Sequence, residues 1–484
     1  KSKWWIIDDH EIMSNIGTEY RLSPAKWLIS FKESEAFKPG ISPRYRPVYY
    51  AIRFTEMMLW GKNVALWHFA RFVIFCLIVF LLWYVSEKYL GILVGGLYVV
   101  YVATFGFWQE VILKLGPAET YASLGLALYI YSFYSILKNN SSWSWILLSL
   151  SSILMIGSKE NMLFVLLPTL LLIIYFYEKK IRLSLVSKIS LLICFSLAFL
   201  VSYAVINVLK NTGYDIYQRS TNFFSRLTLL NNGFRVLFIN KIFYISSAAF
   251  IFIILKMYRG EDRVNKRIFF GIGLYLVAVV TFISQYIFYN GSWLSGNRYD
   301  FPGVLVPSFI LIMTYYFFCN IYKNNYFKLL LNVFCVFGLI ILIIKSNGVK
   351  NLKNAADVNV YRTNYFTSSI IEFAEKVEGT NGCVVTFYTN NPMDYEPIFS
   401  VSSYLRSFGL SNSYNIKPLF CEKVYTEDKL LAYLSRSICE YSDSGFNDLF
   451  VRFDENIGTR CCIGMGSFDT SGCLFYEDIS NSMK

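Results

Sequence analysis

Acidic and basic side chains gather at the edges of long apolar runs in this chain, and their types suit proton transfer beside an anion. The first group is Asp8, Asp9 and Glu11 in "DDHE", directly after the apolar run "WWII". A carboxylate can accept the proton of an attacking hydroxyl as a general base. Arginine and lysine stabilise charge on a departing phosphate, arginine through a bidentate fork and lysine as a point charge. Acids and bases at one bilayer surface therefore favour chemistry on a lipid-linked phosphate.

Further charged positions of this kind occur where later apolar runs begin or end. They are Arg44 and Arg46 in "SPRYRPVYY", Glu110, Lys114 and Glu119 in "WQEVILKLGPAET", Lys159 and Glu160 in "GSKEN", and Arg298 and Asp300 in "GNRYDFPG". Taken singly, Glu110, Glu119, Lys159 and Glu160 are better explained as ordinary helix-boundary residues, and the "RYRP" arginines equally well as anchors to anionic lipid. Arg298 is the least easily explained in this way. Their common side of the membrane, derived below, is the argument for a site. His10 beside flexible carboxylates is a weak metal pattern, so we expect no metal and no cofactor.

Membrane-spanning helices are the elements that must position these residues. The chain has 484 residues, 55% of them hydrophobic and 16% charged, and its mean hydropathy is +0.42; such values are typical of polytopic membrane proteins. Apolar runs long enough to cross a hydrocarbon core of about 30 Å recur along it. We predict spans at residues 66–84, 90–108, 117–137, 143–157, 160–177, 184–207, 242–257, 268–289, 303–322 and 327–345. Ionisable residues are scarce near the centres of these spans, which disfavours an ion-coupled transporter.

Positive charge in the short loops predicts the orientation of the helices. Lysine and arginine collect in alternate loops, at residues 179–188, 256–267 and 323–328, which we assign to the cytoplasm. The segments on the opposite side are then 1–65, 208–241, 290–302 and 346–484. An even number of spans leaves both ends outside, and "WWII" resembles the end of a helix. We therefore expect an additional helix before Lys1, which gives about eleven spans.

The chain divides into three regions by this topology. Residues 1–65 form a first external loop with interfacial helices, residues 66–345 a transmembrane domain, and residues 346–484 an external C-terminal domain. The cysteines of that last region are Cys383, Cys421, Cys439, Cys461, Cys462 and Cys473. An even set outside the cytoplasm, with no CxxC pattern and no histidine nearby, favours disulfides over a zinc site.

Local patterns predict elements within the two external regions. "EIMSNIGTEY" and "VYYAIRFTEMMLWG" have apolar residues at helical spacing, and we expect them along the membrane surface with Trp27, Trp60 and Trp67 at headgroup depth. In the tail, "FTSSIIEFAEKV" and "TEDKLLAYLSRS" each begin with helix-capping residues, and "GCVVTFYT" has the composition of a strand. This order of helix, strand and helix predicts a small α/β domain.

The motifs, taken in order, resemble those of the GT-C superfamily, polytopic glycosyltransferases that use polyprenyl-phosphate-linked sugars. "DDHE" matches the acidic motif of the first external loop and "RYRPVYY" the Arg-Pro segment before the next helix. Lys159-Glu160 matches a later "KE", and Arg298-Tyr299 an "RY" at a late helix end. The pattern covers roughly residues 4–303 and leaves out the tail. Size, basic charge and the cysteine-bearing tail are most similar to the phage-type serotype-converting O-antigen glucosyltransferases of bacteria.

The resemblance implies a fold, a location and an activity. The fold is a polytopic α-helical, GT-C-like protein of the bacterial inner membrane, with its site and C-terminal domain in the periplasm. The activity is inverting transfer of a sugar, by similarity glucose, from a polyprenyl-phosphate donor to a glycan such as lipopolysaccharide O-antigen. The implied base is Asp8 or Asp9; the implied donor-phosphate ligands are Arg44, Arg46, Lys159 and Arg298, and the sugar or acceptor ligands are Glu11, Glu110, Glu119, Glu160 and Tyr299.

Two other functions fit the same sequence features. A polyprenol-linked lipid flippase or transporter would also have basic external loops and aromatic belts. An O-antigen polymerase or ligase would use a diphosphate-linked glycan as donor. The expected partners are membrane lipids, a polyprenyl-phosphate-linked sugar and a lipid-linked or polymeric glycan acceptor. The net charge of +12 is explained by anionic lipids and phosphates rather than by nucleic acid, because no soluble basic module is present.

Overall fold

The computed structural model describes residues 1–5, 9–34, 45–211, 230–258, 265–288, 298, 301–321, 325–378, 383–389, 395–410, 414–420, 447–453 and 474–478. Its helices, in chain order, are α1 (His10–Ile16), α2 (Pro24–Glu33), α3 (Pro47–Trp60), α4 (Val64–Leu90), α5 (Ile92–Ala103), α6 (Phe107–Ile112), α7 (Glu119–Asn139), α8 (Ser142–Ser158), η1 (Glu160–Leu166), α9 (Leu167–Glu178), α10 (Leu185–Asn211), α12 (Leu230–Ile239), α13 (Lys241–Tyr258), α14 (Asn265–Phe288), η5 (Gly303–Leu305), α15 (Val306–Ile321), α16 (Asn325–Ser346), α17 (Gly348–Glu378) and α18 (Tyr395–Ser407). The strands are β1 (Cys383–Thr389), β2 (Tyr414–Phe420), β3 (Asn447–Phe453) and β4 (Leu474–Asp478).

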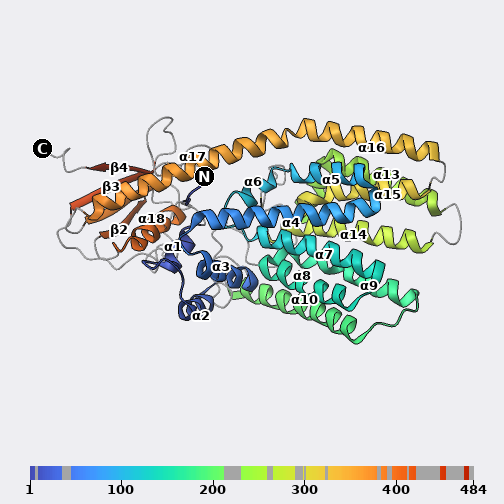
Figure 1. Ribbon diagram of the computed structural model, residues 1–484, viewed down its shortest axis with the longest axis horizontal. Coiled ribbons are helices and arrows are strands. Elements are labelled where there is room, and N and C mark those ends of the chain that lie inside the picture. Colours follow the sequence, from blue (N-terminus) through green and yellow to red (C-terminus); the bar gives the residue numbers. More distant parts are fainter. Residues whose placement is uncertain are drawn as a thin grey trace.

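Apolar helices dominate the described part of the chain, which is a multi-pass helical membrane protein. Five helical segments are long and apolar enough to cross a bilayer: Val64–Leu90, Glu119–Asn139, Glu160–Tyr177, Leu185–Ala204 and Asn325–Glu375. Shorter apolar helices lie at Ile92–Ala103, Ser142–Ser158, Lys241–Leu255, Phe270–Ile283 and Gly303–Cys319. Every span predicted from hydropathy has an apolar helix at its position. These helices lie side by side along the longest dimension of the molecule (Figure 1).

The span predicted at residues 90–108 is divided in the structure. α5 ends at Ala103, where the Thr104 hydroxyl donates a hydrogen bond to the Tyr101 carbonyl at 2.7 Å. A side chain that bonds to nearby backbone in this way competes with the helical ladder. The chain then starts the short helix α6, which carries Glu110. The break therefore sets Glu110 apart from the apolar part of the span.

The helix start predicted in "FTSSIIEFAEKV" is wrong, because α17 begins at Gly348 and runs through this stretch. Thr367 does not cap the helix; its hydroxyl donates to the Thr363 carbonyl at 2.8 Å, as a threonine inside a helix does. At the true start, Gly348 packs directly on the end of α5, since an added Cβ would lie 2.2 Å from the Thr104 carbonyl oxygen. A long helical arm thus leads from α16 toward the tail (Figure 1).

Four strands of the tail form one sheet with the order β2-β1-β3-β4. β1, which lies within "GCVVTFYT", runs parallel to β2 and β3, and β4 is antiparallel to β3. The connection from β1 to β2 contains α18. The connections from β2 to β3 and from β3 to β4, "TEDKLLAYLSRS" and the side chains of the tail cysteines lie outside the described residues, so the α/β domain and its disulfides stay predictions. The four cysteines of the membrane helices, Cys76, Cys194, Cys319 and Cys335, are free thiols.

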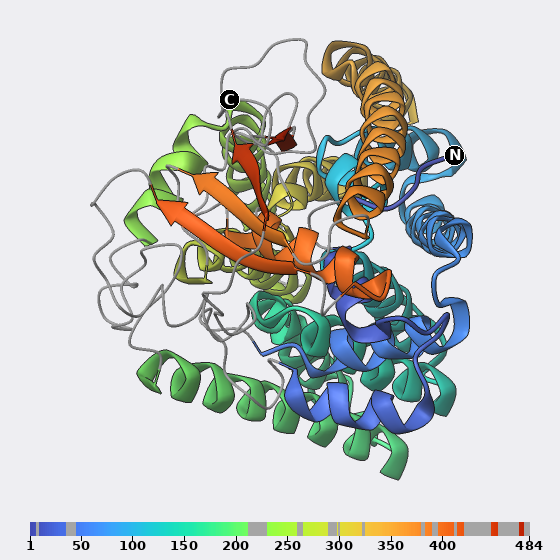
Figure 2. The same ribbon diagram turned by 90° about the vertical axis from the view of Figure 1, so that its left-hand side faces the viewer.

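The described part of residues 1–65 packs against α17 and α18, and Figure 1 and Figure 2 show α1, α2 and α3 at the same end of the helical bundle as the sheet. Side chains of α1, α3, α17 and α18 share one hydrophobic core, which includes Ile12, Met57 and Phe373. Trp67 belongs to it as well: it is 0% exposed and its ring lies 5.2 Å from Trp60. Trp67 is therefore covered by packing within the protein, and its predicted place at headgroup depth stays a prediction.

Candidate functional site

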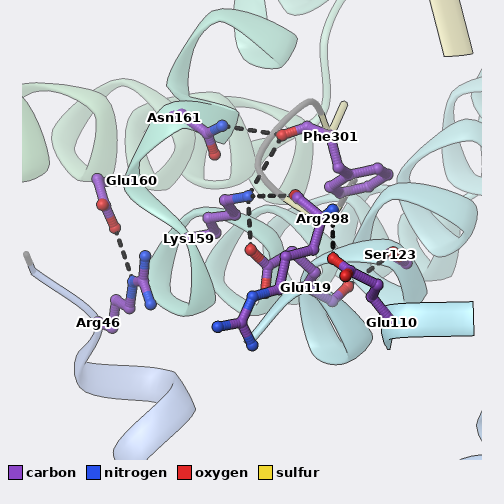
Figure 3. A network of polar contacts seen from close by, with 9 residues as sticks. All are labelled: Arg46, Glu110, Glu119, Ser123, Lys159, Glu160, Asn161, Arg298 and Phe301. Atoms are coloured by element: carbon purple, nitrogen blue, oxygen red, sulfur yellow. Dashed lines mark hydrogen bonds and ion pairs between the residues drawn. The ribbon is translucent and has the colours of Figure 1, made fainter. Parts of the chain in front are cut away.

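The charged residues at the ends of α7 and α8 form a buried network (Figure 3). Lys159, the first residue after α8, is fully buried, and its Nζ lies 2.8 Å from Oε1 of Glu119 at the start of α7. The same Nζ donates to the backbone carbonyls of Arg298 at 3.1 Å and Phe301 at 3.4 Å. A buried ammonium needs both a counter-charge and hydrogen-bond acceptors. Lys159 has both.

The end of α8 directs two neighbouring charges to different partners. Lys159 has extended backbone angles, φ −150° and ψ 116°, which stop α8 at Ser158. The chain continues as η1, and there Oε2 of Glu160 lies 3.1 Å from Nε of Arg46. Arg46 directly precedes α3, which starts with Pro47, a residue suited to the first helical position. The "KE" pair therefore joins α7 on one side and the start of α3 on the other.

The segment around Arg298 is held by side chains from two other elements. The Asn161 amide donates to the Phe301 carbonyl at 2.9 Å, and the Arg298 backbone N–H donates to Oε2 of Glu110 at 3.1 Å. The Phe301 ring stacks on Phe107 of α6, with ring centroids 4.8 Å apart. These contacts place Arg298 next to residues that precede it by more than a hundred positions.

The network combines cations and carboxylates in a region shielded from water. Lys159 pairs directly with the buried Glu119 carboxylate, and Figure 3 shows Arg298 and Arg46 in the same network. Glu110 adds a more exposed pair, 3.6 Å from Nζ of Lys114. Charges fixed in a region of low dielectric act strongly on an anion and need little rearrangement. The arrangement is suited to bind a phosphate through the two arginines while Lys159 holds Glu119.

The structure brings together six of the residues predicted to form a site: Arg46, Glu110, Glu119, Lys159, Glu160 and Arg298. Asp8, Arg44 and Tyr299, which were predicted with them, lie outside the described residues, as does Asp300. The convergence joins sequence positions from 46 to 298. Their predicted roles in binding phosphate or sugar remain predictions.

Asp9 lies in a different environment from this network. It is 2% exposed, and its Oδ2 accepts a hydrogen bond from the Trp5 backbone N–H at 2.9 Å. Tyr404 of α18 donates its hydroxyl to the Trp5 carbonyl at 2.8 Å. Burial, together with the nearby Asp9 carboxylate, raises the pKa of Tyr404 well above its usual value, so this hydroxyl stays a donor. Glu11 is half-buried on α1, the helix that Asp9 directly precedes. These contacts fasten α1 to the N-terminal segment and to α18.

A second buried charge cluster was not predicted from the sequence. Arg71 of α4 binds both oxygens of Glu56 of α3, at 2.9 and 3.0 Å, and the Tyr121 hydroxyl donates to the same carboxylate. Arg53 and Arg71 both donate to the Leu115 carbonyl. The sequence feature that could have indicated this cluster is the pair Arg53 and Glu56, which are three residues apart on an otherwise apolar helix. This cluster fixes the turn that leads into Glu119.

Comparison of the chain with protein-family models, with curated proteins and with solved structures finds no match.

Proposed function

We propose that this protein is an inverting glycosyltransferase that moves a sugar, with glucose as first candidate, from a polyprenyl-phosphate donor to a surface glycan such as lipopolysaccharide O-antigen. The observation that carries the proposal is the meeting of Arg46, Lys159 and Arg298 with three carboxylates at one end of a bundle of membrane helices. The phosphate of a lipid donor lies at the surface of a bilayer, where the ends of membrane-spanning helices also lie. Cations in a water-poor site are what a departing phosphate requires.

The proposed reaction is a single displacement. A carboxylate takes the proton of an acceptor hydroxyl, and the oxygen attacks the anomeric carbon of the donor sugar. The bond from that carbon to the phosphate oxygen breaks, and its electron pair leaves with the lipid phosphate, so the configuration inverts. We assign Arg46 and Arg298, with Arg44, to the phosphate, and Glu11, Glu110, Glu160 and Tyr299 to the sugar or acceptor. Lys159 and Glu119 hold each other and the Arg298 segment in place.

We assign the base to Asp8 rather than Asp9. Asp9 is almost completely buried and binds the Trp5 backbone N–H, so it would have to leave this position to reach an acceptor hydroxyl. Asp8 is the other aspartate of the motif and the first of the two, which is the usual position of the essential acid in the superfamily that the motifs resemble. Asp9 then has a positioning role, in which it holds the segment that carries Asp8.

We place the protein in the bacterial inner membrane, with the site in the periplasm. Residues 1–65 and 346–484 are then periplasmic, the latter as a disulfide-bonded α/β domain built on the described sheet. Two alternatives remain, a polyprenol-linked lipid flippase or transporter, and an O-antigen polymerase or ligase with a diphosphate-linked donor.

Transfer assays with purified protein test the proposal. Incubation with radiolabelled polyprenyl-phosphate glucose and an O-antigen acceptor should give labelled glycan. Asp8→Asn should lower the rate by at least about a hundredfold, because it removes a general base, while Asp9→Asn keeps most of it. Absence of transfer from every monophosphate-linked donor, with lipid translocation in vesicles or transfer from a diphosphate donor instead, would overturn the proposal. Full activity of Asp8→Asn would remove the assigned base.

A further inference from the structure

A pocket lies at the same end of the helices as the charged network, but the residues that line it differ from the network in charge. Its volume is about 240 Å³. The described residues that line it are all uncharged and include Thr104, Gly106, Gln109, Asn240, Ser308 and Asn351. The pocket and the network therefore suit different parts of a ligand.

The pocket and the network share two of their structural elements. Gln109 lines the pocket, and the next residue of α6 is Glu110, which binds the Arg298 backbone. Val304 lines the pocket from η5, just after Phe301, whose carbonyl binds Lys159. The Phe107–Phe301 stack connects α6 to this second segment. One ligand with a charged and an uncharged part can therefore be bound by neighbouring residues of the same two elements.

The lining matches an uncharged group rich in hydroxyls. Gln109, Asn240 and Asn351 carry amides, which both donate and accept hydrogen bonds. The hydroxyls of Thr104 and Ser308 donate to carbonyls of their own segments at 2.7 and 2.8 Å, which leaves their oxygens able to accept from a ligand. A phosphate would enter without a cationic partner among the described lining residues and would lose its charge-assisted hydrogen bonds.

The size of the pocket restricts the ligand further. Its volume of about 240 Å³ is just below the range of roughly 300–1,000 Å³ found for drug-sized ligands. One sugar ring fits that space, and a chain of sugars does not. We propose, on the basis of the glycosyltransferase function argued above, that this pocket binds the single sugar of the lipid-linked donor while Arg46 and Arg298 bind its phosphate.

Gly106 provides a way to fill the pocket without disturbing the backbone. Its φ is −57°, an ordinary helical value, and a Cβ added there meets no atom within 4 Å. A larger side chain therefore extends into open space at the pocket wall. Gly96, on the neighbouring helix α5, has the same free space at its Cβ but does not line the pocket. Gly96→Leu is thus a matched control for Gly106→Leu.

Binding measurements on the purified full chain test the assignment, with two probes: polyprenyl-phosphate glucose and the same polyprenyl phosphate without sugar. Wild type should bind the sugar-bearing lipid more tightly. Gly106→Leu should remove that preference and leave binding of the bare lipid phosphate within about twofold, while Gly96→Leu behaves as wild type. Gln109→Met, which replaces the amide by a side chain of similar shape, should weaken only the sugar-bearing lipid, by roughly five- to tenfold.

The outcomes separate the pocket from the proposed reaction. An unchanged sugar preference in Gly106→Leu and Gln109→Met overturns the pocket assignment even if wild type transfers sugar. Loss of the preference in these variants supports it even if no acceptor is glycosylated, in which case only the transferase function fails. Equal binding of the two lipids by wild type overturns it as well. Competition by a soluble acceptor oligosaccharide, but not by the donor lipid, would assign the pocket to the acceptor and likewise refute the proposal.

Discussion

Lys159 and Glu119 depend on each other, because neither charge has access to water. The ammonium is fully buried and the carboxylate nearly so, and their atoms are 2.8 Å apart. Removal of one partner leaves the other charge buried, a loss that is larger than the net value of the intact pair. The pair also holds the backbone at Arg298 and Phe301. Its first role is therefore to position Arg298.

Lys159→Met should lower the free energy of unfolding by about 3–5 kcal/mol, because Glu119 would remain as a buried charge. The double variant Lys159→Met/Glu119→Leu should regain most of this stability but bind lipid phosphate poorly, since the Arg298 segment loses its anchor. Denaturant titration in detergent measures the first effect. The matched control is Lys114→Met, which breaks a half-exposed pair with Glu110 and should cost less than about 1 kcal/mol. Equal stability of the two single variants would contradict this account.

The residues that meet at one end of the helices could be predicted by type, but their individual partners could not. Lys159 and Glu160 are adjacent in sequence, yet they bind Glu119 and Arg46 because α8 ends between them. No periodicity in "GSKEN" determines that bend. Burial of Asp9 by α18 depends on a contact between the two ends of the chain, which local sequence does not contain.

Helices were the elements best predicted from the sequence, because a long apolar run in a bilayer can form few structures other than a helix. The positions where helices break and the contacts between them were harder to predict. α5 stops at Ala103 through one threonine hydroxyl, and α17 starts earlier than its capping pattern indicated. A close contact between two helices rests on Gly125 of α7, where an added Cβ would lie 2.7 Å from the backbone nitrogen of Met155 in α8. α7 begins with Glu119 and α8 is directly followed by Lys159, so this contact helps to position both residues.

Gly125→Ala should therefore separate α7 from α8. We expect a loss of about 1–3 kcal/mol in the free energy of unfolding, because the added methyl group overpacks a close backbone contact. Gly96→Ala is the control, since its Cβ meets no atom within 4 Å, and it should change stability by less than about 1 kcal/mol. Thermal unfolding in detergent compares the two. Lipid-phosphate affinity should fall in Gly125→Ala alone, and equal behaviour of both variants would refute the close contact.

The whole molecule has two unlike ends. The helix ends that flank the α9–α10 and α15–α16 connections lie at the end of the bundle that is far from the sheet (Figure 1). These connections belong to the loops whose lysines and arginines predicted the cytoplasmic side. The other end carries α1 to α3, the charged network and α17. The loop charges therefore grouped these connections on one side from the sequence alone. The packing of α1 against α17 and α18 could not be predicted in this way, because it joins segments that are far apart in the sequence.

Impermeant maleimide labelling of intact spheroplasts tests which end faces outward. Lys32→Cys on α2, Lys353→Cys on α17 and Lys179→Cys after α9 place a thiol at exposed positions of the two ends. In protein whose native cysteines are replaced by serine, the first two variants should label in intact cells. Lys179→Cys should label only after permeabilisation, because positively charged loops are retained in the cytoplasm. The reverse pattern would place the charged network on the cytoplasmic side, where a periplasmic O-antigen acceptor cannot reach it.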